Sequence, residues 1–389
     1  MRVLLAHNRY RIRGGEDRYV DLLFDLLERG GHQVVKLIED SRKIGSKIAA
    51  AKEMFASPEA VRDLRDLLDR GAVDVAHIHN LFPRLSPAIL DELKRRRIPV
   101  VMTVHNLRLI CPVATCFDGE AVCERCCRGN GLSCMVHNCR GRRMESLVYG
   151  TAFTHHRRRR VFERCVDRFI VLNGFYREML TRYGFPAEKI VIQPYMVEGG
   201  DGTAERRGER YILFFGRLSR EKGVETLLKA AALLPEVAVR IAGSGEDEER
   251  LRAICSQRGI ANVRFVGYLQ GWELSQEIDG AAFVTVPSEW YENFPYSALE
   301  SLVRGRAVIA AEIGGLPELV QDGVNGLLFK PGDENELAGK IRRLWENPEE
   351  ARGMGLEGRR LAAQRYAPEE HLRRIEEIYR SVCEESGRR

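Results

Sequence analysis

Short runs rich in Val, Ile and Leu alternate with longer helical patterns along this chain, and this alternation constrains its fold more than any other feature. Apolar runs of this kind are typical of parallel strands that are buried on both faces and connected through helices. The alternation occurs once in each half, so we expect an α/β chain with two doubly wound, Rossmann-like domains. The predicted strands are residues 2–6, 33–38, 73–78, 100–104 and 169–171, then 211–215, 237–242, 263–266, 283–286 and 307–310.

Residues 197–209 separate the two series and are rich in glycine and charge but poor in apolar side chains, which is typical of a linker. We therefore predict an N-terminal domain over residues 1–196 and a C-terminal domain over residues 210–366. The amphipathic segment in residues 367–389 is predicted to be a terminal helix that packs back on the N-terminal domain. Ligands bind at the carboxyl ends of strands in such sheets, so we expect the two domains to face a central cleft.

Composition and charge narrow the class of protein. With 44% apolar and 30% charged residues the chain reads as a globular protein, and no apolar run reaches the ~20 residues that span a bilayer. Residues 1–200 carry a net charge of +10, whereas residues 201–389 carry −5. A basic half favours an anionic partner such as a phospholipid leaflet, although ordinary solvated surface charge explains it equally well. Ten cysteines without a secretion signal indicate a reducing, cytoplasmic location.

A basic motif follows the first strand of the second half, in the sequence FGRLSREKG. Gly216 allows a tight turn at the strand end, and Arg217 and Lys222 bring two cations to one place. A diphosphate needs that compensation, and Arg supplies a planar fork while Lys supplies a point charge. A solvated basic turn is the alternative. The next strand ends in AGSGE, where Gly243 would let a ligand approach the backbone, although a lone Gly-x-Gly is a weak signal.

Two carboxylates, Glu292 and Glu300, lie eight residues apart in the segment PSEWYENFPYSALE. If a helix begins near Pro295, Glu292 precedes it and Glu300 lies in its second turn. The free amides of that helix start favour an anion, and flanking carboxylates suit the recognition of sugar hydroxyls. A helix with ordinary surface acids is the alternative interpretation. A glycine-rich turn, GGLPE, follows the last predicted strand and is consistent with a loop near a nucleotide.

Taken in order, GRLSREKG, AGSGE, FVGY, the Glu-x7-Glu segment and GGLPELV resemble glycosyltransferase family 4, a retaining group with the GT-B fold. The resemblance is dense over residues 211–365 and looser in the N-terminal half. It implies transfer of a sugar from a UDP- or GDP-linked donor to a saccharide or lipid-linked acceptor, in bacterial polysaccharide or lipid-linked oligosaccharide assembly. It also implies that the chemistry requires no cofactor and that nucleic acid is not a partner.

The resemblance assigns roles to individual residues. Arg217 and Lys222 would hold the donor diphosphate. Glu300 would bind the ribose hydroxyls, and Glu292 would face the transferred sugar. Family members often have glycine where this chain has Pro295. Proline lacks an N–H, so contacts with the sugar and phosphate would fall to the amides of Tyr296 and Ser297. The remaining donor-binding candidates in this half are Gly216, Gly243, Gly267, Tyr268, Asn293, Phe294, Tyr296 and Ser297.

The N-terminal half contributes further candidates. Gly14 and Gly15 match a family loop that closes over the donor, with a flexible surface loop as the alternative. His105 follows a predicted strand, and in similar enzymes a histidine there contacts the transferred sugar, so it joins Glu292, Arg217 and Lys222 as a catalytic candidate. His79 has a similar placement and weaker support. The run HHRRRR at residues 155–160 is read either as a membrane-surface contact or as a solvated helix face.

Seven cysteines crowd residues 111–139, and Cys123-x2-Cys126 has the spacing of a metal-binding knuckle. On its resemblance to a subgroup of the family, the proposed structural zinc site is Cys111, Cys123, Cys126 and Cys139. Free thiols and disulfides are the alternatives. Two other functions remain open, a sugar-nucleotide epimerase of the same fold, which would convert the donor alone, and a zinc-containing nucleic-acid-binding protein, which would leave the donor motifs unexplained.

Overall fold

The computed structural model describes residues 1–10, 14–43, 45–197 and 210–387. Of these, residues 1–118, 123–196 and 368–387 form a compact N-terminal unit, and residues 119–122, 197 and 210–367 form a C-terminal unit. The predicted linker lies outside the described residues from position 198 onward. No described helix is long and apolar enough to span a lipid bilayer.

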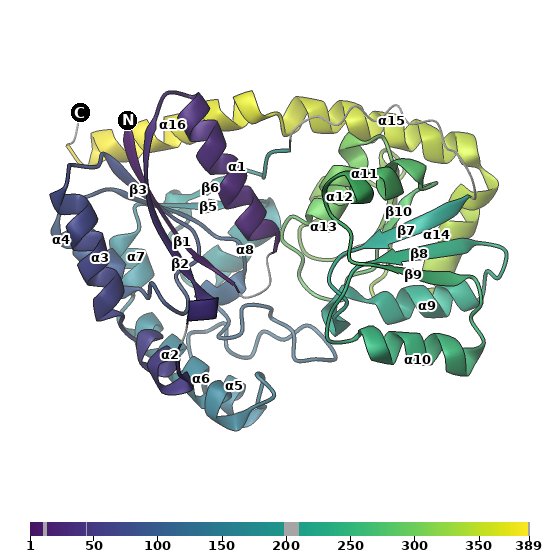
Figure 1. Cartoon of the computed structure of the whole chain (residues 1–389), viewed down its shortest axis with the longest axis horizontal. Coiled ribbons are helices and arrows are strands. Elements are labelled where there is room, and N and C mark those ends of the chain that lie inside the picture. The colour runs from purple at the N-terminus through teal and green to yellow at the C-terminus, as the bar shows by residue number, and fades with distance from the viewer. Residues whose placement is uncertain (11–13, 44, 198–209, 388–389) are drawn as a thin grey trace. The chain divides into compact units, whose positions relative to one another are not determined.

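The N-terminal unit is a six-stranded parallel sheet flanked by helices (Figure 1). Its strands are β1 (Arg2–Arg9), β2 (Gln33–Asp40), β3 (Val75–Ile78), β4 (Val100–Thr103), β5 (Arg168–Val171) and β6 (Ile190–Ile192). Its helices are α1 (Gly15–Arg29), α2 (Lys47–Glu53), α3 (Pro58–Asp69), α4 (Ala88–Arg95), α5 (Leu132–Val136), α6 (Arg143–Arg158), α7 (Val161–Cys165), α8 (Gly174–Arg182) and α16 (Pro368–Glu385). The strand order β2-β1-β3-β4-β5-β6 reverses between β1 and β3, which makes that edge the expected ligand site.

The C-terminal unit repeats this architecture with a second parallel sheet of six strands. Its strands are β7 (Tyr211–Phe215), β8 (Ala238–Ala242), β9 (Val263–Gly267), β10 (Val284–Val286), β11 (Val308–Ala311) and β12 (Gly326–Phe329). Its helices are α9 (Val224–Ala232), α10 (Glu248–Arg258), α11 (Gly271–Gly280), α12 (Tyr296–Val303), α13 (Leu316–Leu319), α14 (Glu334–Glu346) and α15 (Pro348–Arg365). The order β12-β11-β10-β7-β8-β9 is that of a dinucleotide-binding sheet and reverses between β7 and β10.

The doubly wound α/β fold class predicted from the alternation is confirmed in both units. In Figure 1, α9 and α10 cover one face of the C-terminal sheet while α11 and α12 cover the other. Two strands were missed by the sequence prediction, β6 and β12. Both lie at an outer edge of their sheets and have only three and four residues. Runs of three or four residues are too short to show a sequence period, whereas the other two edge strands, β2 and β9, are longer and were predicted.

The last helix, α16, belongs to the N-terminal unit because its apolar stripe is buried there. Ile375, Tyr379 and Val382 recur at helical spacing and are at most 1% exposed. The Tyr379 hydroxyl lies 2.6 Å from Nδ1 of His77 on β3, and Tyr19 on α1 bonds to His371 at 3.0 Å. These bonds lie beneath the strand ends that carry the N-terminal site candidates.

Candidate active site

Lys222, which is partly exposed, and the buried Glu292 form an ion pair in the loops that follow β7 and β10, the two strands between which the sheet order reverses. Lys222 Nζ lies 2.6 Å from Glu292 Oε1, and Ser288 Oγ donates to the same oxygen at 2.6 Å. Burial raises the pKa of Glu292, but the Lys222 charge and these two bonds outweigh it, so this pKa lies below its ordinary value. The carboxylate is therefore ionised at neutral pH and fixes the position of the ammonium group.

The loops after β7 and β10 are also joined through their backbones. Gly223 has φ of +64°, and a Cβ atom there would lie 1.8 Å from the carbonyl oxygen of Pro287. Glu289 N–H donates to Glu221 O at 2.9 Å, and Thr226 Oγ1 donates to Glu289 Oε1 at 2.6 Å. The glycine that ends FGRLSREKG is thus required by the neighbouring loop, and the pairing of Lys222 with Glu292 follows from this close approach.

Three of the predicted glycines meet one another at the ends of β7, β8 and β9. Gly243 N–H donates to Gly267 O at 2.7 Å, and Gly216 N–H donates to Ala242 O at 3.0 Å. A Cβ atom at Gly243 would lie 1.9 Å from Gly216 O. The close approach that the sequence analysis assigned to a ligand at Gly243 is therefore made by the protein's own backbone, which is sufficient reason for the glycine.

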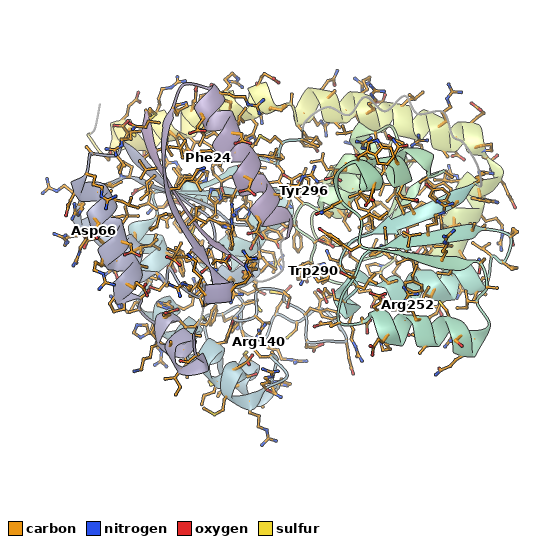
Figure 2. The ribbon with its side chains drawn as sticks, in the orientation of Figure 1. Phe24, Asp66, Arg140, Arg252, Trp290 and Tyr296 are labelled. Atoms are coloured by element: carbon orange, nitrogen blue, oxygen red, sulfur yellow. The ribbon has the colours of Figure 1, made fainter. Side chains whose placement is uncertain are left out.

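Helix α12 begins as predicted, with Pro295 at its N-cap and Glu300 in its second turn. The first intrahelical bonds to the Pro295 carbonyl come from Ala298 at 3.1 Å and Leu299 at 3.2 Å. The amides of Tyr296 and Ser297 precede these bonds at the positive end of the helix dipole. Figure 2 labels Tyr296 together with Trp290, whose ring centroid lies 5.0 Å from Lys222 Nζ. Glu300 is buried, 8% exposed.

The other candidates of this unit separate into exposed and buried groups. Arg217 is exposed, and within the described residues no ion pair to its guanidinium is found. Tyr268 is also exposed, at 65%, directly after β9. Asn293 and Phe294 are buried instead, and the Phe294 ring packs edge-on against Tyr366 with a centroid distance of 5.3 Å. The structure thus brings together the ion pair and the helix start, and leaves Arg217 and Tyr268 at the surface of the same unit.

In the N-terminal unit, three neighbouring strands each carry a His-Asn pair at their carboxyl ends: His7-Asn8 on β1, His79-Asn80 after β3 and His105-Asn106 after β4. His79 Nδ1 lies 2.9 Å from His105 Nε2, and His105 Nδ1 lies 2.6 Å from the Tyr195 hydroxyl. His79, which had the weaker support from sequence, is thus the hydrogen-bond partner of His105. The repeated dipeptide is a sequence signal that would have identified His7 as well.

The surroundings of His105 define what this side chain can do. Burial, together with the nearby His7 and His77, lowers the pKa of His105 well below its ordinary value, so the ring is neutral at pH 7. Both of its ring nitrogens bond to protein groups, His79 and Tyr195. A direct contact between His105 and a sugar requires one of these bonds to be replaced, and the catalytic role of His105 stays a prediction.

The Gly14–Gly15 turn is anchored by Asp17, a residue that the sequence analysis missed. Asp17 is 1% exposed and accepts the Gly14 N–H at 3.0 Å through one oxygen, while its other oxygen lies 2.9 Å from His7 Nε2. A Cβ atom at Gly14 would meet no protein atom within 4 Å, so the fold itself does not require this glycine. The predicted contact of Gly14 and Gly15 with the donor stays a prediction.

The cysteine-rich segment does not assemble the proposed zinc site. All ten cysteines are free thiols, and among the described residues no three His, Cys, Asp or Glu side chains are placed to hold a metal ion. Cys116 Sγ lies 3.7 Å from Cys127 Sγ, and the Cys116 thiol also bonds to Cys111. Cys134 bonds to Cys139. Two of the predicted ligands, Cys111 and Cys139, thus pair with cysteines outside the predicted set. As placed, the four predicted ligands do not fit a zinc ion, and bound zinc stays a prediction.

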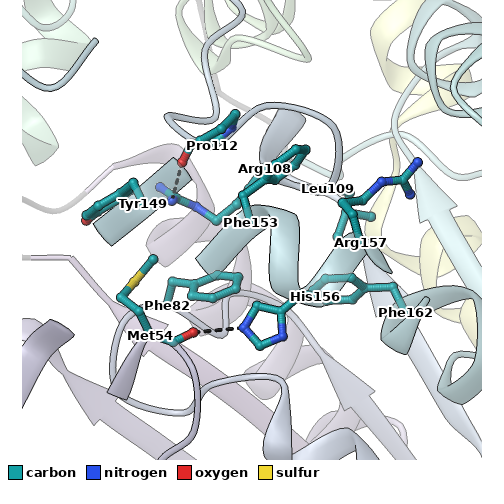
Figure 3. Close-up of a pocket in the computed structure, with 10 residues that line it drawn as sticks. All are labelled: Met54, Phe82, Arg108, Leu109, Pro112, Tyr149, Phe153, His156, Arg157 and Phe162. Carbon is teal, nitrogen blue, oxygen red and sulfur yellow. Dashed lines mark hydrogen bonds between the residues drawn. The ribbon is translucent and has the colours of Figure 1, made fainter. Parts of the chain in front are cut away.

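Two of the six residues in the basic run 155–160 face inward, and the other four are exposed. His156 and Arg157 line a small cavity with a volume of about 20 Å³. His156 donates a hydrogen bond to the Met54 carbonyl at 2.9 Å (Figure 3). Arg108 in the same wall donates to Pro112 O at 3.0 Å. The complete lining is Met54, Phe82, Arg108, Leu109, Pro112, Tyr149, Phe153, His156, Arg157 and Phe162. The run is therefore neither wholly a solvated face nor wholly a membrane contact.

Comparison with known proteins places this arrangement in a family. The family model described as "Glycosyl transferases group 1" matches residues 201–361, and the one described as "Glycosyl transferase 4-like domain" matches residues 14–196. Alpha-D-kanosaminyltransferase of Streptomyces kanamyceticus is 28% identical over 223 residues, which are 53% of this chain and 58% of that protein. The chain spans about a quarter to three fifths of the length of the curated relatives that it matches.

Solved structures show the same fold. Sucrose-phosphate synthase from Thermosynechococcus elongatus aligns with a TM-score of 0.75 at 21% identity, over 98% of both chains. Anabaena HepE, in a complex with UDP and glucose, aligns with a TM-score of 0.66 at 18% identity, over 97% of this chain and 99% of that one. Because two glycosyltransferase models together match both units, and the solved structures align over nearly the whole chain, the chain belongs to the family 4 type of glycosyltransferases with the GT-B fold.

Proposed function

We propose that this protein transfers a sugar from a nucleoside diphosphate to a hydroxyl acceptor, with retention of configuration at the anomeric carbon. The observation that carries the proposal is the ion pair at the sheet's point of reversal, between Lys222 in the loop after β7 and the buried Glu292 in the segment that leads into α12. A fixed ammonium group and the first amides of a helix are suited to the charge that develops on a departing diphosphate.

In the proposed reaction the bond between the anomeric carbon and the diphosphate oxygen breaks, and the acceptor oxygen forms its bond on the same face of the sugar. The acceptor proton passes to the departing diphosphate. Lys222, the Tyr296 and Ser297 amides and the exposed Arg217 would stabilise that leaving group. Glu292 is ionised, so it would act through its negative charge on the positively charged sugar and not as a proton donor.

The finer assignments rest on the family. HepE, similar in fold, is described in complex with UDP and glucose, and this supports a UDP-linked sugar as the first donor to test. Glu300, buried on α12, is assigned to the ribose hydroxyls, and the backbone at Gly267 and Tyr268 to the base. A saccharide or lipid-linked acceptor, in polysaccharide assembly at the inner face of the cell membrane, completes the proposal.

Titration calorimetry with UDP-, GDP-, ADP- and CMP-sugars tests the donor, and product analysis with and without acceptor tests the transfer. Lys222→Ala should lower transfer by about a hundredfold, the usual effect of removing one group that stabilises transition-state charge. The matched control is Lys229→Ala, which removes a partly exposed pair with Glu225 on α9 of the same unit and should leave transfer unchanged.

Three results would contradict the proposal. The first is the absence of binding to every nucleotide sugar, accompanied by salt-sensitive binding of RNA or DNA. The second is conversion of the donor alone, without acceptor, which would indicate an epimerase. The third is normal turnover by Lys222→Ala, which would show that the Lys222–Glu292 pair is not part of the active site.

A further inference from the structure

Four large apolar side chains are exposed on α5 and on the first half of α6. Leu132 is 54% exposed and Val136 71% on α5, and Met144 is 69% exposed and Leu147 43% on α6. We call these four residues the α5–α6 surface. Within each helix the two residues lie three or four positions apart and so share one side of it. Apolar side chains that gather in one exposed region, especially beside polar ones, are a feature of protein or membrane contact sites.

The two helices are held together firmly beneath this surface. Cys134 on α5 and Ser146 on α6 are 1% and 0% exposed, and the Cys134 thiol donates to the Ser146 carbonyl at 3.9 Å. Gly131 and Gly150 touch through their backbones, since a Cβ atom at Gly131 would lie 2.2 Å from Gly150 O. The apolar side chains of the α5–α6 surface therefore face outward because the opposite sides of both helices are already packed.

The same region carries a strong positive charge. Residues 128–160 contain eight arginines and a single acidic residue, Glu145. Arg128, Arg140, Arg142 and Arg143 are exposed, and Figure 2 shows Arg140 beside α5 and α6. Arg142 and Arg140 share Glu145, at 3.1 and 3.9 Å, while Arg157 and Arg159 pair with acids outside this segment. Glu145 therefore does not balance the charge of the four exposed arginines.

We propose that the α5–α6 surface docks on an anionic phospholipid bilayer, with the four apolar side chains in the headgroup boundary and the arginines on lipid phosphates. Apolar side chains combined with basic ones are what such an interface recognises. A second copy of this chain is disfavoured as the occupant, because two surfaces of the same positive charge would repel each other. The assignment moves the membrane contact away from residues 155–160, where His156 and Arg157 face inward and Arg159 pairs with Asp91.

Flotation of the full-length protein with vesicles tests this proposal and needs no catalytic activity. The protein should bind vesicles of phosphatidylglycerol and phosphatidylethanolamine, bind vesicles of phosphatidylcholine much more weakly, and be released by salt. The double variants Leu132→Ser/Val136→Ser and Met144→Ser/Leu147→Ser should each lower the partition coefficient at least about tenfold. Arg142→Ala/Arg143→Ala should lower it about twenty-five-fold, since each basic residue near the surface contributes about fivefold.

The matched control is Leu233→Ser/Leu356→Ser, which removes two apolar side chains of similar exposure from the C-terminal unit and should bind vesicles like the wild type. Each variant should keep the wild-type melting temperature and bind donor nucleotide normally, so a failure of this proposal is distinct from a failure of the proposed transfer. Wild-type vesicle binding by both apolar variants would overturn the inference. So would a dimer that only these variants convert to monomer in light scattering, because the occupant would then be a second copy.

Discussion

At the scale of single residues, the N-terminal site depends on histidines that burial keeps neutral. His77 on β3 lies 2.7 Å from Thr103 Oγ1 and 2.6 Å from the Tyr379 hydroxyl, so both ring nitrogens are bonded in the core. Burial and the neighbouring His371 lower its pKa from 6.5 to about 3. Neutral rings of this kind orient one another without adding charge. The His77 ring contacts the His79 ring, which in turn stacks on the His105 ring.

A pH dependence of stability follows from His77. Between pH 6.5 and about 3 the unfolded chain binds a proton that the folded ring does not bind. The stability contributed by neutral His77 is therefore complete above pH 6.5 and is lost as the pH falls toward 3, by about 1.4 kcal/mol per pH unit. Urea unfolding from pH 7 to pH 4 measures this slope. The non-titrating variant His77→Gln should show a smaller slope, and equal slopes would contradict the assignment.

At the scale of elements, the donor-side motifs are turns that must fit one another before they can fit a ligand. The loop after β7 is tied to the loop after β10 through Gly223, and to the loop after β8 through Gly216 and Gly243. Each contact places one backbone against another at a distance that no side chain tolerates. This explains why the glycine positions of the three motifs are coupled although they are far apart in the sequence.

Gly243→Ala is the corresponding test. The added Cβ atom would lie 1.9 Å from Gly216 O, so the turn must open, at a cost of about 3 kcal/mol, with loss of donor binding. Gly339→Ala on α14 is the matched control, because a Cβ atom there meets nothing within 4 Å and alanine favours a helix by about 1 kcal/mol. Thermal unfolding and calorimetry with UDP measure both effects. A Gly243→Ala protein with wild-type stability and UDP affinity would show that the turn is not constrained as described.

At the scale of the whole molecule, the chain builds two units and then returns from the second to complete the first. Helix α16 contributes Ile375, Tyr379 and Val382 to the N-terminal core after the chain has passed through the C-terminal unit. The N-terminal unit therefore contains segments from both ends of the described chain. The donor motifs, in contrast, all belong to the C-terminal unit.

This division predicts separate responses in differential scanning calorimetry. Ile375→Ala opens a cavity in the N-terminal unit, because Ile375 is 0% exposed, and should lower the stability of that unit by about 3 kcal/mol. A bound nucleotide should instead raise the transition of the C-terminal unit. A single transition in which the variant and the nucleotide shift the same peak would show that the two units unfold together.

The amino-acid sequence by itself determined the fold class and the donor-side motifs of this protein. The reason is local: the alternation of strand and helix patterns, the glycine turns and the start of α12 at Pro295 are properties of neighbouring residues. Strands of three or four residues, such as β6, are too short to show a sequence period and were missed.

Only the tertiary structure decided which side chains meet. Lys222 and Glu292 are 70 residues apart, and His77 and Tyr379 are 302 residues apart. No local pattern encodes such a pair, because the partners are brought together by the strand order and by the return of α16. The same holds for the exposed faces of α5 and α6, since burial of their opposite sides, and not their composition, leaves four apolar side chains in water.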